Sequence, residues 1–213
     1  MKTTQLFPLI CIVICCGHAQ AQKENLVAGA DPDDWTVFNR KVTFKKETIH
    51  LNAKASDGLL ILNDVDFKNG TIELDIKGKN TPGRSFVGMA FHVLDNSTFD
   101  AVYFRPFNFR NPQRNSHSIQ YISMPDNDWS ILRKSFPGKY EHTIDPVPEP
   151  VDGWFHVRIE VEHPEVKVFV NGAEKPTLQV EQISERKHGK LGFWVGNGSE
   201  GWFRDLKITH AGQ

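Results

Sequence analysis

Residues 156–172 read HVRIEVEHPEVKVFVNG, and two runs in this stretch alternate apolar and polar side chains. In the first run the apolar residues are Val157, Ile159 and Val161, and in the second the valines recur in the same way. A period of two places the apolar side chains on one face of a half-buried β-strand. The short turn HPE separates the runs, which therefore predict two half-buried antiparallel strands.

The same alternation recurs on both sides of this stretch, in TIELDIK (71–77) and DLKIT (205–209). Segments rich in Gly, Asn, Asp and Pro separate the runs, among them KASDG, VLDNSTFD, NGAEKP and GNGSEG, and such compositions favour turns. A sustained helical stripe is absent from the sequence, although VEQISERK (180–187) is compatible with one turn of helix. Many short strands without intervening helices predict an all-β fold, a jelly-roll β-sandwich of two antiparallel sheets.

The first 21 residues have the composition of a secretory signal peptide. Lys2 supplies a basic start, an apolar run follows, and small residues lead to a cleavage site after Ala21. We therefore expect a single mature domain over 22–213 that is secreted, periplasmic or attached to the cell surface. Because Cys15 and Cys16 close the apolar run, a lipid-anchored protein is the alternative.

Cysteine and charge content limit the kinds of site and partner that the chain can have. All three cysteines lie within residues 1–21, so the expected mature chain has no disulfide and no cysteine ligand or nucleophile. The 25 basic and 26 acidic residues nearly balance, which argues against nucleic acid as a partner. Beyond the N-terminal segment, the sequence contains no run apolar enough to span a membrane. These features leave the oligomeric state open.

One long stretch, 106–153, departs from the strand pattern. It carries seven prolines and a single good strand pattern, SIQYIS (118–123). Loops of this length usually have a function or are disordered. Its aromatic residues predict an ordered loop that packs on the sandwich: Phe107, Phe109, Tyr121, Trp129, Phe136 and Tyr140.

Four segments together carry a family resemblance. They are FKNGTIELDIKG (67–78), FVGMAFHVLDNSTFDAVYFRPF (86–107), DGWFHVRIEVEHPEVKVFVNG (152–172) and GKLGFWVGNGSEGWFRDLKI (189–208). In this order they resemble the concanavalin A-like lectin and glucanase superfamily, close to its laminin-G-like and keto-disaccharide-hydrolase-like bacterial members. The resemblance extends from Trp35 onward. It implies a concanavalin A-like jelly roll and makes binding or cleavage of a glycan the leading function.

Glu73 and Asp75 raise the question of a catalytic carboxylate pair. Both lie on the polar face of the predicted strand TIELDIK, opposite its apolar residues. The glucanases of the resembled superfamily use the first and third acids of a Glu-x-Asp-x-Glu pattern, and the third position here is Lys77. We therefore interpret the pair as a solvated strand face beside basic neighbours. No catalytic residue is assigned.

Trp194 is the first candidate for contact with a sugar. It alternates with Phe193 and Val195 and lies between Gly192 and Gly196, which leaves its ring uncrowded along the strand. Sugar sites combine flat apolar surfaces with fixed hydrogen-bonding groups. The alternative is that Trp194 is a packing residue.

Polar residues on neighbouring strands supply the remaining candidates. The segment MAFHVLDNSTFDAVYFRPF predicts a hairpin with its turn at DNST, on which His92, Tyr103 and Arg105 alternate with apolar residues. Gln120 falls on the next predicted strand. We therefore expect a carbohydrate-binding face that contains His92, Tyr103, Arg105, Gln120 and Trp194. For His92 the alternative is an ordinary hydrogen-bonded histidine.

We expect no cofactor, although oxygen-bearing side chains near the hairpin turn leave a weak possibility of calcium. Asp95, Asn96 and Asp100 are residue types that bind this ion, but turn chemistry alone explains Asp and Asn there.

The expected function is recognition of a poly- or oligosaccharide on one sheet face, beneath the 106–153 loop. Binding and glycoside hydrolysis both remain open. The other alternative is a laminin-G-like protein-interaction module without sugar chemistry, which would expose a broad apolar patch where a sugar site has a groove.

Overall fold

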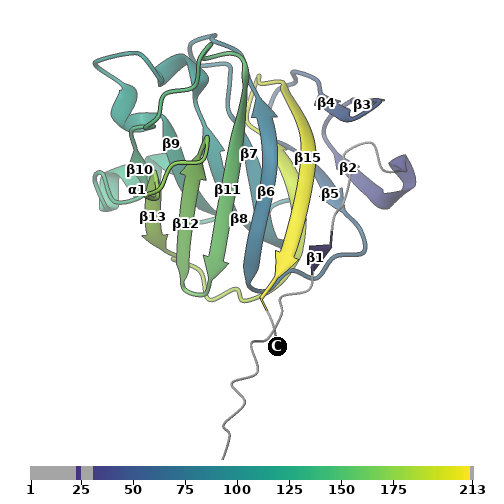
Figure 1. Cartoon of the computed structure of the whole chain (residues 1–213). Helices are drawn as coiled ribbons and strands as arrows, with labels where there is room; N and C mark the ends of the chain where they lie inside the picture. Colours follow the sequence, from purple (N-terminus) through teal and green to yellow (C-terminus); the bar gives the residue numbers. More distant parts are fainter. Residues whose placement is uncertain (1–22, 25–30, 212–213) are drawn as a thin grey trace, which may run out of the picture.

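The computed structural model describes residues 23–24 and 31–211, which form two antiparallel β-sheets packed face to face (Figure 1). The expected signal peptide and the start of the mature chain lie outside the described residues. Sheet A contains, in spatial order, β13 (Leu178–Glu181), β12 (Glu165–Val170), β11 (Trp154–Glu162), β6 (Gly70–Lys77), β15 (Gly201–His210), β4 (Thr48–Leu51) and β3 (Val42–Lys45), with β1 (Lys23–Glu24) beside β15. Sheet B contains β10 (Glu141–His142), β9 (Ile119–Met124), β8 (Phe99–Phe104), β7 (Val87–Val93), β14 (Lys190–Val195), β5 (Gly58–Leu62) and β2 (Trp35–Phe38).

This topology confirms the predicted jelly-roll sandwich. Strands that are distant in sequence lie side by side, such as β6 between β11 and β15 in sheet A and β14 between β7 and β5 in sheet B. The described part of the chain contains no helix that is long and apolar enough to cross a membrane.

The period-two pattern places the core between the sheets. On β6, Ile72, Leu74 and Ile76 are fully buried, while the residues between them are half-buried on the outer face of sheet A. Aromatic rings join the two sheets: Phe193 on β14 stacks on Phe203 of β15, with centroids 4.5 Å apart and planes 9° apart. Sheet packing therefore buries the face that the sequence pattern marks as apolar.

Sheet B differs from sheet A because both of its faces are largely covered. Every residue of β7 and β8 is buried, in contrast to the alternation on β6. The 106–153 segment supplies part of this cover, since it is ordered, contributes β9 and β10 to the sheet, and carries the buried residues Phe109, Leu132 and Tyr140. The strand expected at 118–123 is confirmed as β9.

Helical structure lies where the sequence did not predict it. The 106–153 segment holds the helix α1 (Trp129–Ser135) and the short 3-10 turns η2 (Pro106–Asn108) and η3 (Asn115–His117), and a further turn, η1 (Pro32–Asp34), precedes β2. The helical turn expected within 180–187 is wrong: β13 continues to Glu181, and an irregular connection then leads to β14. Val180 packs in the core from β13, and Ile183 packs against the core from the loop that follows, so the two residues do not form one face of a helix.

Candidate functional site

A pocket of about 190 Å³, which we call the Trp194 pocket, opens on the outer face of sheet B. Phe193 points inward to sheet A, so its neighbour Trp194 points to this outer face. The residues that line the pocket combine aromatic rings, two carboxylates and an amide: Asp57, Phe86, Tyr103, Ile122, Met124, Asp128, Trp129, Trp194, Gly196 and Asn197.

The floor of this pocket is built from one cross-strand row. Trp194 pairs with Gly88, which in turn pairs with Tyr103. A Cβ at position 88 would lie only 2.6 Å from the Cβ of Tyr103. The absence of a side chain at Gly88 therefore leaves room for the Tyr103 side chain to extend over β7. The rings of Tyr103 and Trp194 meet with centroids 4.8 Å apart. Trp194 is 4% exposed and therefore forms a packed floor.

Arg105 and Gln120 lie behind this floor and fix the position of Tyr103. Nη2 of Arg105 donates to the Tyr103 hydroxyl and, at 3.3 Å, to Oε1 of Gln120, while Nη1 donates to the carbonyl of His117. Burial raises the pKa of Tyr103 to about 12, so its phenol stays protonated. The structure thus brings together four of the expected residues, although Arg105 and Gln120 are buried against protein groups.

His92 does not share this face, and that part of the expectation is wrong. A positive φ of 48° at His92, beside an irregular β7–β14 register, breaks the alternation. Its fully buried ring packs on Phe67, with Nε2 2.8 Å from the carbonyl of Lys68 and Nδ1 3.2 Å from Gln182. Burial lowers the pKa of His92. It is the ordinary hydrogen-bonded histidine of the alternative interpretation.

Two carboxylates with different environments face the pocket. Burial raises the pKa of Asp57, although the nearby Arg40 guanidinium opposes this shift. Burial also acts to raise the pKa of Asp128, but hydrogen bonds from Ile131 and Ser130 outweigh it and hold that pKa below its ordinary value. One acid is therefore biased toward its neutral form and the other toward its ionised form.

Arg40 holds the loops that carry Asp57 and the 195–197 segment. Its side chain is 7% exposed and donates to the carbonyls of Asn39, Ser56, Val195 and Gly196. A Cβ at Gly58 would meet the Arg40 side chain at 2.4 Å, so the glycine after Asp57 makes room for the guanidinium. Asp57, which the sequence places in a turn, is therefore part of the pocket wall.

Helix α1 supplies the exposed rim, which the sequence analysis missed. Asp128 caps it by accepting hydrogen bonds at Oδ1 from Ser130 N and Ile131 N, at 2.8 and 2.9 Å. Trp129, the first helical residue, is 46% exposed and stacks on Arg133 one turn later, at 4.9 Å. Asp128 at the N-cap was a local signal, but a helix of seven residues has too few turns to show a stripe.

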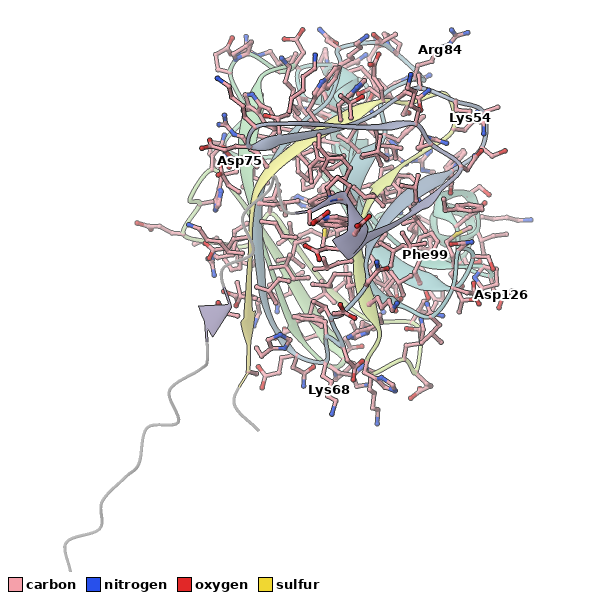
Figure 2. The ribbon with its side chains drawn as sticks, turned by 90° about the vertical axis from the view of Figure 1, so that its right-hand side faces the viewer. Lys54, Lys68, Asp75, Arg84, Phe99 and Asp126 are labelled. Atoms are coloured by element: carbon pink, nitrogen blue, oxygen red, sulfur yellow. The ribbon has the colours of Figure 1, made fainter. Side chains whose placement is uncertain are left out.

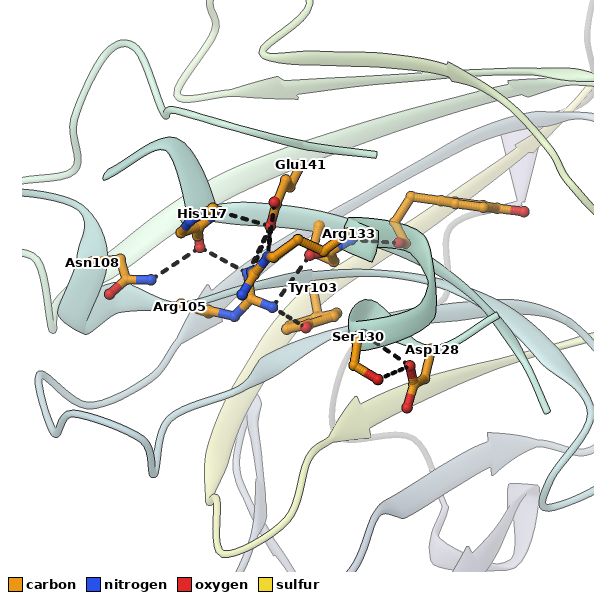
Figure 3. A network of polar contacts seen from close by, with 10 residues as sticks. Tyr103, Arg105, Asn108, His117, Asp128, Ser130, Arg133 and Glu141 are labelled. Carbon is orange, nitrogen blue, oxygen red and sulfur yellow. Dashed lines mark hydrogen bonds and ion pairs between the residues drawn. The ribbon is translucent and has the colours of Figure 1, made fainter. Parts of the chain in front are cut away.

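Arg133 is itself fixed by a buried carboxylate (Figure 3). Its Nε and Nη2 contact Glu141 at 2.9 and 2.6 Å, and Glu141 is 4% exposed. The orientation of Trp129 over the pocket therefore depends on an ion pair between α1 and β10.

The acids of β6 lie far from this pocket. Asp75 accepts from Arg204 at 3.0 Å and contacts His156 at 3.0 Å, and Glu73 lies 3.6 Å from the same histidine. Figure 2 places Asp75 on the side of the sandwich opposite Asp126, which precedes α1. As expected, the pair belongs to a solvated strand face with basic neighbours.

The oxygen-bearing residues near the hairpin turn do not converge. Asp95 accepts from the backbone and hydroxyl of Ser97, as a turn residue does. Asp100 is fully buried and bonded to Tyr121, Ser184 and Arg186 at 2.6, 2.8 and 3.1 Å. Within residues 31–211, no group of three or more His, Cys, Asp or Glu side chains is arranged to hold a metal ion.

Solved structures resemble the whole sandwich. The carbohydrate-binding module CBM66 from Bacillus subtilis is 15% identical, with a TM-score of 0.60 over 82% of this chain and 95% of that chain. A putative glycosyl hydrolase from Parabacteroides distasonis is 13% identical, with a TM-score of 0.61 over 89% and 100%. The exoplasmic/lumenal domain of VIP36, in its Ca²⁺/Man3GlcNAc-bound form, is 12% identical, with a TM-score of 0.58 over 85% of each chain. These likenesses establish the concanavalin A-like fold.

A comparison with curated proteins found no match. The family model of the 3-keto-alpha-glucoside-1,2-lyase-like domain, in contrast, matches residues 22–209, nearly the whole sequence. The chain belongs to the family of 3-keto-alpha-glucoside-1,2-lyase-like domains.

Proposed function

We propose that this protein recognises a carbohydrate and that one sugar unit enters the Trp194 pocket. The observation that carries the proposal is the composition of the pocket: an exposed indole, Trp129, lies at the rim of a cavity that also presents Asp57, Asp128 and Asn197. Flat aromatic surfaces suit the C–H faces of a sugar, and carboxylates and amides suit its hydroxyl groups.

The size of the pocket indicates how much of a glycan it takes. Its volume of about 190 Å³ is smaller than the roughly 300–1,000 Å³ of pockets that enclose a drug-sized ligand. We therefore propose that a single unit is held and that the rest of an oligosaccharide extends outside. A protein-interaction module would use a broad apolar patch, whereas this small pocket places two carboxylates and an amide among aromatic rings, a mixture that favours a sugar.

A second candidate function, proton transfer to and from the bound sugar, is favoured by the unequal carboxylates. Two acids whose pKa values shift in opposite directions suit the roles of general acid and general base. In the 1,2-elimination that the family description names, the base removes the proton on C2, next to a C3 ketone. The C–H electron pair forms the C1=C2 bond, the C1–O bond breaks, and the acid protonates the leaving oxygen. Asp128 would be the base and Asp57 the acid.

The binding proposal is tested by Trp129→Ala, with Phe136→Ala as the matched control. Both residues are similarly exposed, at 46% and 41%, but only Trp129 lines the Trp194 pocket. Loss of the indole should weaken the affinity for a glycan found by array screening by about 1–3 kcal/mol. Calorimetric titration of both variants measures this. Equal affinities in the two variants would refute the pocket assignment.

Catalysis is tested separately with Asp128→Asn and Asp57→Asn. Asparagine caps a helix as well as aspartate, so Asp128→Asn keeps α1 while removing the base. Elimination from a 3-keto-glucoside creates a conjugated enone, which ultraviolet absorbance follows. A decrease of about 100-fold or more in the turnover rate of each variant supports the proton-transfer roles. Unchanged turnover, with Asp126→Asn as the neutral control, would exclude them.

Export is part of the proposal, because residues 1–21 have the composition of a signal peptide. N-terminal sequencing of the protein recovered outside the cytoplasm should begin at Gln22. A retained leader, or a lipid on Cys16, would contradict this cleavage.

A further inference from the structure

A second cavity lies on the other side of α1 from the Trp194 pocket, and we call it the His117 pocket. Its volume is about 360 Å³, within the range of small-ligand sites. It is lined by the turn at 137–138 and by the side chains of Ser116, His117, Arg133, Glu141, His142 and Thr143. It shares no lining residue with the Trp194 pocket.

Positive charge exceeds negative charge around this cavity (Figure 3). Among the described residues that line it, Glu141 carries the only carboxylate. Two arginines share that carboxylate: Arg133 through Nε and Nη2, and Arg105 from behind, with Nη1 3.9 Å from Oε2. His117 also approaches Glu141, with Nδ1 2.8 Å from Oε2. Two permanent cations and one anion leave a net charge of +1, before any proton on His117 is counted.

The cluster is buried behind the cavity and partly open at its surface, because the side chains of Arg133 and His117 are 34% and 33% exposed. Arg105 is 5% exposed and Glu141 is 4% exposed. Hydrogen bonds from Arg133 hold the pKa of Glu141 low even though burial acts to raise it, so the carboxylate is ionised. Water screens the buried Arg105 charge poorly, so Arg105 adds to the attraction that the partly exposed Arg133 exerts on an anion in the cavity.

Several polar groups in the cavity have no protein partner among the described residues. Arg133 uses Nε and Nη2 on Glu141, which leaves Nη1 free. Nδ1 of His142 donates to the carbonyl of Thr143 at 3.1 Å, which leaves Nε2 of the neutral ring as a free acceptor. His117, whose Nδ1 faces Glu141, offers Nε2 in the same way. The hydroxyls of Ser116 and Thr143 complete a lining that offers both a cation and neutral polar groups.

We propose that the His117 pocket binds a sugar acid, a ligand with one carboxylate and several hydroxyls. The carboxylate accepts from Nη1 of Arg133 and neutralises the excess charge. The hydroxyls meet Ser116, Thr143 and the Nε2 acceptors of the neutral His117 and His142 rings. A monoanion matches the net charge of +1, and a cavity of this volume admits one sugar unit. A free sugar acid and an acidic unit at the end of a glycan present the same chemistry. The proposal does not depend on the function of the Trp194 pocket.

The test is an NMR titration of the ¹⁵N-labelled mature protein at low salt with D-glucuronate, D-glucose and inorganic phosphate in parallel. Glucuronate should shift the amides of residues 116–117 and 142–143, and glucose should leave them unchanged. Phosphate that binds there as tightly as glucuronate would overturn the assignment to a sugar acid. Glucuronate shifts confined to residues 194–197 would place the acid in the other pocket and overturn it as well.

Variants connect the titration to the side chains. Arg133→Lys retains a positive charge beside Glu141 but loses the free Nη1 donor, and it should weaken glucuronate binding about tenfold or more. His117→Gln should also weaken it, whereas His188→Gln, an exposed histidine paired with Asp66, should not. If Arg133→Lys does not fold, Thr143→Val removes a hydroxyl without touching the ion pair. Unchanged affinity in both His117→Gln and Thr143→Val would refute the site.

Discussion

The burial of Trp194 predicts that Trp194→Ala damages the fold more than the exposed rim variant Trp129→Ala does. Trp194 is 4% exposed and packs on Tyr103, and a Cβ at Gly196 would lie only 2.9 Å from its ring. Truncation of a buried aromatic residue costs about 3–5 kcal/mol. Trp129 is 46% exposed, so about half of its surface is at stake, or roughly 2 kcal/mol.

These free energies translate into melting temperatures. In a domain of this size, each kcal/mol shifts the midpoint by about 2–4 °C. Trp194→Ala should therefore melt roughly 6–20 °C below the wild type, and Trp129→Ala roughly 4–8 °C below it. Thermal unfolding followed by near-ultraviolet circular dichroism measures both, with Phe136→Ala as a control for the loss of an exposed ring.

The comparison also separates the roles of the two indoles in binding. Trp129→Ala should lose glycan affinity at a temperature where the protein remains folded. Trp194→Ala should lose affinity because the packed floor of the pocket is disrupted. If Trp194→Ala melts no lower than Trp129→Ala, the description of Trp194 as a packed floor is refuted.

Three further variants probe individual charges. Burial raises the pKa of Asp57 above its value in the unfolded chain, near 3.8, so the contribution of Asp57 to stability declines as the pH rises through the folded pKa. Asp57→Asn should therefore be more stable than the wild type at pH 7 but not at pH 3. The same difference in stability between variant and wild type at both pH values would contradict this. Glu141→Gln leaves two arginines without their buried carboxylate and should cost about 3–5 kcal/mol in urea unfolding; a cost under about 1 kcal/mol would show that the ion pair is dispensable. Glu73→Gln, on the solvated face of sheet A, should change stability by less than about 1 kcal/mol and leave glycan affinity intact; a large loss of affinity would restore the catalytic interpretation of β6.

The sequence predicts the sandwich because its information is local and repeated. The alternation in β6, β11 and β12 specifies which face is buried, and each of these strands lies where its pattern predicted. The resemblance then indicated that such strands form a concanavalin A-like jelly roll. Tyr103 and Trp194 were placed on one face for the same reason, since both alternate with apolar residues on strands that lie on either side of β7.

The rest of the site depends on features that a period-two pattern does not carry. His92 left the expected face because an irregular position in β7 reverses the alternation locally. Trp129 lies on a seven-residue helix, and Asp57 lies in a turn that Arg40 shapes from another part of the chain. These residues acquire their roles through contacts between distant segments, and the pairing of such segments is not encoded in local periodicity.

Occupation of the Trp194 pocket on sheet B by a sugar unit can be observed by NMR titration of the ¹⁵N-labelled wild-type protein with a neutral oligosaccharide. Binding in this pocket should give saturable shifts at the indole N–H of Trp129 and at the amides of Asp57, Asp128 and Asn197. Trp154 and Trp202 lie on the outer face of sheet A, next to the buried Phe155 and Phe203. Shifts confined to these two tryptophans, with none at the residues of the Trp194 pocket, would refute that binding site.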